Sequence, residues 1–433
     1  MKLWQKEESI DKIFERFTVG KDPELDIYLA KYDIIGSRAH VKMLGQIGLL
    51  KSEEIIAIGL GLDNIDQMID SGTFEISEGV EDCHSQIEIL LTEELGEIGK
   101  KIHSGRSRND QVLTTLKLFA KSELEEIATL IKDLFELLMA MSERYKNVLM
   151  PGYTHMQIAM PSSFGLWFAA YAESLLDDLL QLKSSYQLVD KNPLGSAAGY
   201  GCSFPLNRLS TTEEMGFGGI NVNAIYAQMT RGKMEKSVGF SVNSIAATLS
   251  KFAMDVCLYS GQNFNFLKVD KKYTTGSSIM PHKANPDGFE LVRAKCNLLQ
   301  ALPYELNMIL LNLPSGYHRD LQVLKERFMP ALFSLKDCLK ITTAMTTQLS
   351  IEAEVINDPK YDLIFSVEEV NRRVTAGVPF RDAYHAVSAS IKQGDLHINR
   401  KIDHTHIGSI GNLGNDLIKE SFKKAYAFFE RMI

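Results

Sequence analysis

The segment TTGSSIMPHKANPD, residues 274–287, holds the side chains best suited to chemistry. It combines a flexible glycine with adjacent hydroxyls at Ser277 and Ser278, a cation at Lys283 and an amide at Asn285. Lys283 and Asn285 could hold a carboxylate while a serine approaches the adjacent carbon, since charged and amide groups donate hydrogen bonds to carboxylates. The segment is not a phosphate-binding P-loop, because the G-x-x-x-x-G-K-[ST] spacing is missing. Taken alone, it has an alternative interpretation as a serine-rich turn.

Four other polar segments contain glycine or proline and separate long stretches that contain neither. They are HSGRSRND (103–110), PGYTHMQ (151–157), NPLGSAAGYG (192–201) and LPSGYHRDLQVLKE (313–326). Loops held by a rigid scaffold are where binding and catalytic groups concentrate. We therefore expect these segments and residues 274–287 to carry the functional side chains.

The string G-S-S-x-M-P-x-K-x-N-P, within residues 276–286, resembles the signature of the fumarase/aspartase superfamily. Members of this superfamily eliminate a group from the β-position of a carboxylate, and most of them release fumarate. The resemblance implies the same chemistry for this chain, but it does not identify the leaving group.

Further segments resemble the argininosuccinate lyase branch of that superfamily. They are E-D-x-H-x-x-x-E from Glu81, H-S-G-R-S-R-N-D-Q-V from His103, G-Y-T-H-M-Q from Gly152, Y-x4-Q-x2-K from Tyr317 and G-V-P-F-R from Gly377. The resemblance extends from about residue 29 to residue 385, nearly the whole chain. It implies that the chain splits argininosuccinate into arginine and fumarate, with no cofactor.

Breaking a C–N bond β to a carboxylate requires a base for a weakly acidic proton, donors for the resulting charge and an acid for the departing nitrogen. By resemblance, Ser277 is the base, and Lys283 and Asn285 stabilise the charge on the carboxylate. His155, oriented by Glu290, is the acid or its proton partner, which suits a side chain that titrates near neutral pH. The resemblance also implies substrate contacts from Asp82, His84, Arg108, Asn109, Thr154, Ser278, Asn285, Tyr317, Gln322 and Lys325. The alternative for these contacts is a polar network at a domain junction, or a histidine that braces its loop.

The sequence departs from the family pattern at several positions. His282 stands where this branch usually has glutamine, and Met160 replaces the second glutamine of Q-x-A-Q-P. The segment FTVGKDPELD, residues 17–26, lacks the usual serine, which leaves Thr18 as the candidate for one substrate contact. TRGK near Arg231 replaces a more acidic pattern. Two alternatives stay open: another fumarate-releasing lyase such as adenylosuccinate lyase, and an inactive crystallin-like structural homologue.

Composition excludes several classes of protein. The chain has 433 residues and a formal net charge of −8, without the cluster of Lys and Arg typical of a nucleic-acid binder. No apolar stretch reaches the roughly 18 residues that a membrane helix needs. The histidines show no H-E-x-x-H or comparable spacing, so we expect no metal. The five cysteines form no C-x-x-C pair and the N-terminus resembles no signal peptide, which predicts a cytoplasmic protein.

The spacing of Gly and Pro predicts long helices. Residues 106–150 contain neither and place apolar side chains at helical intervals, which predicts a helix of roughly 35–40 residues, or roughly 55–60 Å. Further helices are expected over residues 166–192, 240–260, 289–301 and 331–358. The predicted fold class is all-α.

The resemblance implies three helical domains and a homotetramer in which long central helices bundle and each active site draws loops from three chains. We place the domains at residues 1–106, 107–353 and 354–433, with the catalytic loop 274–287 in the central one. A helix this long needs other long helices to cover its apolar surface, which favours self-association over the alternative of a monomeric bundle.

Overall fold

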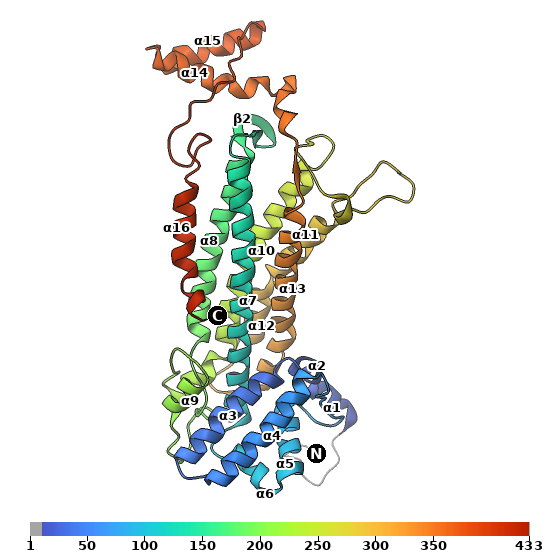
Figure 1. The fold of residues 1–433 in the computed structure, drawn as a ribbon, viewed down its shortest axis with the longest axis vertical. Helices are drawn as coiled ribbons and strands as arrows, with labels where there is room; N and C mark the ends of the chain where they lie inside the picture. Colours follow the sequence, from blue (N-terminus) through green and yellow to red (C-terminus); the bar gives the residue numbers. More distant parts are fainter. Residues whose placement is uncertain (1–10, 433) are drawn as a thin grey trace. The chain divides into compact units, whose positions relative to one another are not determined.

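The computed structural model describes residues 11–432 and is mostly helical (Figure 1). The α-helices are α1 (Lys12–Val19), α2 (Asp22–Asp26), α3 (Ala30–Gln46), α4 (Ser52–Asp70), α5 (Cys83–Leu95), α6 (Glu97–Lys100), α7 (Arg108–Arg144), α8 (Phe164–Val189), α9 (Arg208–Glu214), α10 (Ala224–Tyr259), α11 (Asp287–Leu299), α12 (Leu302–Leu310), α13 (Leu324–Thr346), α14 (Ser366–Thr375), α15 (Phe380–Gln393) and α16 (Asn415–Tyr426). The strands are β1 (Leu149–Thr154), β2 (Gln157–Ser163), β3 (Leu267–Lys268) and β4 (Ser350–Ile351). No helix among the described residues is long and apolar enough to cross a membrane.

The longest helices confirm most of the predictions made from Gly and Pro spacing. α7 has 37 residues, within the expected length, and α8 and α11 lie close to their expected positions. α10 begins earlier than expected and is interrupted at Arg231 and Gly232, where the backbone leaves the helical region. Gly232 has a φ of 84°, a conformation that glycine adopts readily because it has no Cβ.

The helix expected over residues 331–358 is wrong at both ends. α13 begins at Leu324, contains Pro330 in its second turn and ends at Thr346. Proline is therefore not the helix boundary here, although its missing N–H removes one backbone hydrogen bond. After Thr346 the chain forms β4, which pairs antiparallel with β3. The apolar residues beyond Thr346 belong to this short sheet and the 3₁₀ turn that follows it.

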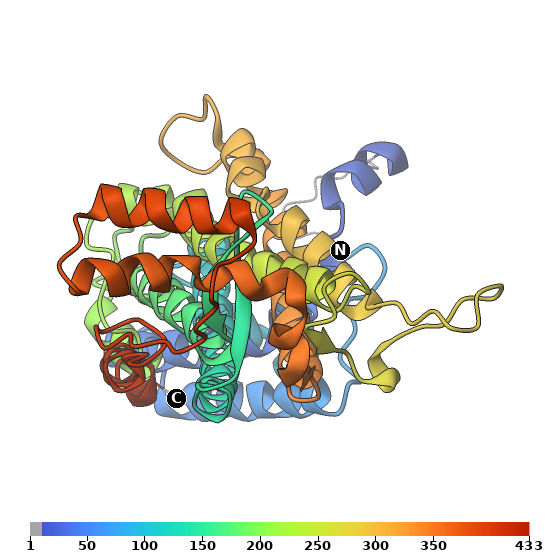
Figure 2. The same cartoon turned by 90° about the horizontal axis from the view of Figure 1, so that it is seen from above.

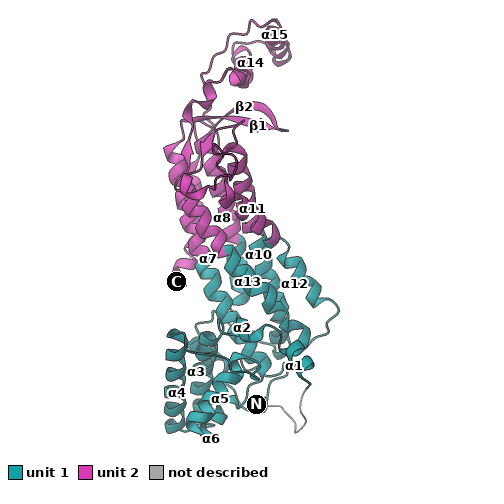
Figure 3. Ribbon diagram, turned by 90° about the vertical axis from the view of Figure 1, so that its right-hand side faces the viewer, with its two compact units in different colours: residues 1–127, 181–243, 299–335 teal, residues 128–180, 244–298, 336–433 magenta. Residues whose placement is uncertain are grey.

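The chain forms two compact units, each built from three separate pieces of sequence (Figure 3). Unit 1 comprises residues 1–127, 181–243 and 299–335, and unit 2 comprises residues 128–180, 244–298 and 336–433. The boundary between the two falls within α7, α8, α10, α11 and α13. The three-domain division expected above follows the order of the chain and stays a prediction.

In unit 1, α3, α4 and α5 pack side by side (Figure 1). The ring of Phe119 in α7 makes edge contacts with Tyr32 in α3 and with Phe333 in α13, at centroid distances of 5.8 and 6.0 Å. Such aromatic pairs contribute about 0.5–1.5 kcal/mol each beyond the area that they bury. They hold the part of α7 around Phe119 against α3 and α13.

In unit 2, an aromatic cluster joins α8 to α10. The Trp167 ring stacks on Phe252 at 5.5 Å, and its indole N–H donates a hydrogen bond to Asp255 at 3.0 Å. Near the C-terminus, Phe422 of α16 stacks on Phe135 of α7 with ring centroids 3.7 Å apart. Helices α14 and α15 lie side by side (Figure 2) and bury a small apolar core of their own.

Candidate active site

A cavity of about 510 Å³ in unit 1 collects residues from distant parts of the sequence. Six of the residues predicted to bind substrate line it: Asp82, Arg108, Asn109, Tyr317, Gln322 and Lys325. They come from the start of α5, the start of α7 and the segment that leads into α13. The structure therefore brings three of the motif segments together within one unit.

Asp82 occupies the N-cap of α5. Its Oδ1 accepts a hydrogen bond from the backbone N–H of Ser85 at 2.7 Å, and its Oδ2 lies 3.6 Å from Arg108 Nε. Burial by itself raises the pKa of a carboxyl, but the positive charge of Arg108 and the partners of Asp82 hold its pKa below the ordinary value. Asp82 is therefore ionised at neutral pH and fixes Arg108 on the cavity wall.

The RSRND segment, residues 106–110, leads into the first turn of α7, which begins at Arg108. The Arg108 guanidinium donates hydrogen bonds to Gln111 at 3.0 Å and to Ser85 at 3.2 Å, which fixes its orientation beside Asn109. Asp110 points the other way and accepts hydrogen bonds from the backbone N–H groups of Gly195 at 2.9 Å and Ala197 at 2.7 Å. This carboxylate attaches the polar segment 192–201 to the start of α7.

His84 lies behind the cavity wall. Its side chain is fully buried, and Nδ1 is 2.8 Å from Asp33 Oδ1. Gln111 donates a hydrogen bond to the same carboxylate at 2.9 Å. His84 is thus not among the residues that line the cavity in this chain. His103 does line the cavity, and its Nδ1 lies 3.4 Å from Glu88 Oε2. A direct substrate contact by His84 stays a prediction.

Lys325 is almost completely buried between two carboxylates of α2. Its Nζ lies 2.8 Å from Asp22 Oδ1 and 2.7 Å from Asp26 Oδ1. Burial alone would lower the pKa of Lys325, but the two carboxylates overcome that effect and raise it above the ordinary value. The ammonium is therefore permanently charged, and it is already neutralised by protein groups.

Backbone carbonyls of the segment that precedes α2 accept hydrogen bonds from side chains of the cavity wall. Gln322 donates hydrogen bonds to the carbonyls of Thr18 at 3.0 Å and Val19 at 3.1 Å, and Arg319 donates to Thr18 at 2.7 Å. The hydroxyl of Thr18 donates to the carbonyl of Phe14 at 2.9 Å. Thr18 is thus placed as a backbone anchor, and it does not line the cavity.

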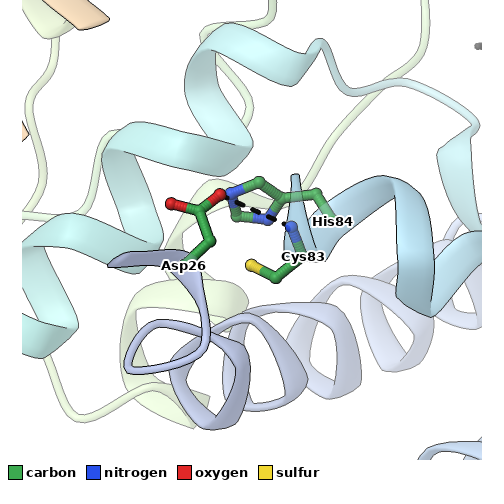
Figure 4. A group of neighbouring side chains, drawn as sticks. All are labelled: Asp26, Cys83 and His84. Atoms are coloured by element: carbon green, nitrogen blue, oxygen red, sulfur yellow. Dashed lines mark hydrogen bonds between the residues drawn. The ribbon is translucent and has the colours of Figure 1, made fainter. Parts of the chain in front are cut away.

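Asp26, Cys83 and His84 form a buried group of oxygen, sulfur and nitrogen atoms that lie within 4.8 Å of one another (Figure 4). These are ligand types that zinc accepts. However, Asp26 already pairs with Lys325, and burial with three nearby carboxylates raises the pKa of the Cys83 thiol well above its usual range. A protonated thiol beside an ammonium is a poor cation site, and Asp26 instead serves to hold Lys325.

The segment 274–287 belongs to unit 2, where it extends away from the helices (Figure 2). Thr275 and Asn285 close its base through two backbone hydrogen bonds of 3.2 and 2.9 Å. Ser277 Oγ accepts hydrogen bonds from the backbone N–H groups of Ile279 at 3.4 Å and Met280 at 3.2 Å. Ser278 and Lys283 are exposed. Two backbone N–H groups therefore donate to the oxygen of Ser277, and such donors would stabilise its negative charge if the hydroxyl were ionised.

Thr154 and His155 lie at the tip of the β1–β2 hairpin, also in unit 2. His155 and Met156 both have a positive φ, at 52° and 58°, which is the geometry of a type I′ turn, and Thr154 pairs with Gln157 across it. The sequence had indicated a loop rather than a hairpin here. His155 is exposed, as is Glu290 in the first turn of α11, and no hydrogen bond joins the two within the described chain. Their pairing stays a prediction.

The sequence prediction missed several cavity residues, including Asp22, Arg231 and Arg319. Asp22 and Asp26 are four residues apart, a spacing that places both carboxylates on one helix face and indicates a shared partner. Nothing local identifies that partner as Lys325, which lies 299 residues from Asp26.

Comparison with known proteins identifies the family of this chain. A profile of a family described as "Lyase" matches residues 5–300. The chain is 56% identical over 433 residues to the argininosuccinate lyase of Parabacteroides distasonis, covering 100% of this chain and 97% of that protein. It is 40% identical over 392 residues to the argininosuccinate lyase of Thermotoga neapolitana, covering 89% of this chain and 97% of the other.

Two solved structures share the fold at low sequence identity. EDDS lyase in complex with formate superposes with a TM-score of 0.75 at 22% identity, covering 98% of this chain and 91% of the other. A fumarate lyase (delta crystallin) from Brucella melitensis, bound to cobalt, gives a TM-score of 0.74 at 16% identity, covering 97% and 94%. The fold is therefore that of the fumarate lyases. The full-length identity together with the motif segments shows that this chain belongs to the argininosuccinate lyase family of the fumarate lyase superfamily.

Proposed function

We propose that this chain catalyses the reversible β-elimination of argininosuccinate to L-arginine and fumarate, the last step of arginine biosynthesis. The observation that carries the proposal is the cavity of unit 1, which gathers six of the predicted substrate contacts from three separate segments. The full-length likeness to argininosuccinate lyases supports the same reaction.

The elimination begins with a proton transfer. Ser277 removes the proton from the carbon beside the succinyl carboxylate, and the backbone N–H groups of Ile279 and Met280 stabilise the negative charge on its oxygen. The electron pair of the C–H bond moves onto that carboxylate, which becomes a doubly negative aci-carboxylate. Lys283 and Asn285 donate to it. One well-placed donor contributes about 2.7–4 kcal/mol to the transition state, so two contribute about 5–8 kcal/mol.

The second step breaks the carbon–nitrogen bond. The electron pair returns from the aci-carboxylate to form the double bond of fumarate, and the guanidino nitrogen leaves with the bonding pair. His155, oriented by Glu290, gives this nitrogen its proton or passes it from a neighbouring group. Asn109, Thr154, Tyr317 and Gln322 hold the substrate, so positioning supplies much of the remaining rate enhancement.

We further propose that four chains assemble and that each active site takes its loops from three of them. α11 exposes Leu291 and Leu298, at 61% and 76%, and α12 exposes Tyr304 and Met308, at 67% and 70%. Apolar side chains this exposed favour a protein–protein interface. Such an assembly would combine the unit 1 cavity of one chain with the Ser277 loop and the His155 hairpin of others. The scattered cysteines and the pathway favour a cytoplasmic location.

Light scattering on the purified protein should give a mass of about four times the 48.6 kDa of one chain. Leu298→Glu should lower that mass, because a charge on an apolar contact must be desolvated, and Leu298→Met should not. A single-chain mass for the unaltered protein would contradict the assembly.

The reaction itself is tested by fumarate release. Purified protein should raise the ultraviolet absorbance of a solution of argininosuccinate and leave a matched solution of adenylosuccinate unchanged. Turnover of adenylosuccinate alone would assign the chain to another lyase of the superfamily. No turnover of either would indicate a different substrate or an inactive homologue.

A further inference from the structure

Asp22 was not among the residues predicted from the sequence to contact the substrate. The segment 17–26 lacks the serine of the family pattern, and Thr18, the candidate left there, does not line the cavity. Asp22 does line it, and the residue is 6% exposed on a wall that it shares with Tyr317 and Gln322.

Asp22 and Asp26 hold the same lysine but differ in what they leave open. Asp26 is fully buried and uses both oxygens, Oδ1 toward Lys325 at 2.7 Å and Oδ2 toward the backbone N–H of Cys83 at 3.4 Å. Asp22 uses Oδ1 toward Lys325 at 2.8 Å, and its Oδ2 accepts no hydrogen bond from any residue in the described part of the chain. One carboxylate oxygen of this group is therefore available to a ligand.

The charges at this end of the cavity do not cancel. Asp22 and Asp26 together carry two negative charges, and the Lys325 ammonium carries one positive charge. The group as a whole thus favours a cation and is a poor receptor for a carboxylate. Burial and the charge of Asp26 raise the pKa of Asp22 to about 6, although Lys325 and Arg231 act to lower it.

The other acids that line the cavity are already paired. Asp82 caps α5 and contacts Arg108. Glu81 forms an ion pair with Arg319, and Glu88 lies 3.4 Å from His103 and 3.9 Å from Arg108. Each of these three carboxylates therefore lies beside an arginine.

We propose that Asp22 is a specificity-determining residue that binds the α-ammonium group of the arginine half of the substrate through its open carboxylate oxygen. This inference rests on the proposed function. The succinyl half and the guanidino nitrogen must lie beside Ser277, Lys283 and His155, none of which line this cavity. The amino-acid end of the substrate is what remains for unit 1 to bind, and its ammonium is the group that an excess of negative charge selects.

The test uses the reverse reaction, in which fumarate combines with L-arginine or with 5-guanidinopentanoate. The second compound is arginine without its ammonium group. Fumarate consumption is followed by absorbance, and kcat/KM is measured for each co-substrate with the unaltered enzyme, with Asp22→Asn and with Asp26→Asn. Because the two co-substrates are compared on the same preparation, any loss of folded protein cancels from their ratio.

We expect the unaltered enzyme to prefer arginine strongly, because a site built to bind a polar group rejects an analogue that lacks it. Asp22→Asn should lower the preference at least tenfold, mainly through the KM for arginine. Asp26→Asn should slow both co-substrates and lower the preference by less than Asp22→Asn does, because it removes the surplus negative charge but keeps the Asp22 oxygen that binds the ammonium. That pattern of results supports the inference.

A preference that is unchanged in Asp22→Asn overturns the inference, and so does an equal change in both variants, which would make Asp22 a support for Lys325 only. If Asp22→Asn has no measurable turnover, the same ratio is taken from the dissociation constants of the two co-substrates by calorimetry. Failure of the unaltered enzyme to consume fumarate with arginine would instead contradict the proposed function.

Discussion

Ser277→Ala should fold like the unaltered protein and lose nearly all turnover of argininosuccinate. General base catalysis contributes about 10²–10⁴-fold to rate, so the loss should fall in that range. The substitution removes an oxygen that accepts only two long backbone hydrogen bonds, of 3.4 and 3.2 Å, in an extended segment. Stability should therefore change by no more than about 0.5 kcal/mol.

The rate is measured by fumarate absorbance and folding by the thermal melting curve. Thr274→Val is the matched control, because it removes a hydroxyl from the same segment that donates only to the carbonyl of Lys271. This control should keep its activity. A Ser277→Ala enzyme with more than a tenth of the original rate would exclude Ser277 as the base.

Lys325→Met should strongly destabilise the protein. It leaves the carboxylates of Asp22 and Asp26 buried without their cation, and removing one partner of a buried ion pair costs about 3–5 kcal/mol. The midpoint of urea denaturation at neutral pH measures the effect. The triple variant that adds Asp22→Asn and Asp26→Asn should regain most of the loss, because it no longer buries uncompensated charge.

The same variant should depend on pH in a defined direction. Without Lys325, burial should raise the pKa of Asp22 further above the unfolded value of about 3.9, so the folded state is favoured when this group is protonated. The stability of Lys325→Met should therefore fall as pH rises from about 4 to above 6, more steeply than in the unaltered protein, where Asp22 has a pKa of about 6. A variant that denatures like the original at neutral pH would mean that the group contributes little to stability.

The sequence predicted the helices best where a single local signal was sufficient. The absence of Gly and Pro together with helical spacing located α7, α8 and α11, because both properties depend on residues within a few turns of one another. The prediction failed at α13, where Pro330 lies inside the helix, and at the β1–β2 hairpin, where His155 and Met156 adopt positive φ without a glycine. In both places, packing outweighed local preference.

The candidate site, like the helices, was predicted only in part from the sequence. The motif segments identified the family, which the full-length relatives confirm, and six of their residues do line one cavity. Motif membership alone did not distinguish a residue on the cavity wall, such as Arg108, from one behind it, such as His84. It also gave no place to Asp22, which departs from the family pattern.

The sequence by itself determined the family, the class of reaction and the main helices of this protein, because motif spacing and helical periodicity are local properties of the chain. The tertiary structure alone decided which polar side chains share a cavity and which are buried together. Lys325 illustrates the reason. Its charged state is stabilised by Asp22 and Asp26, which lie about 300 residues away in sequence. The local sequence around Lys325 does not predict these partners or the burial that they share.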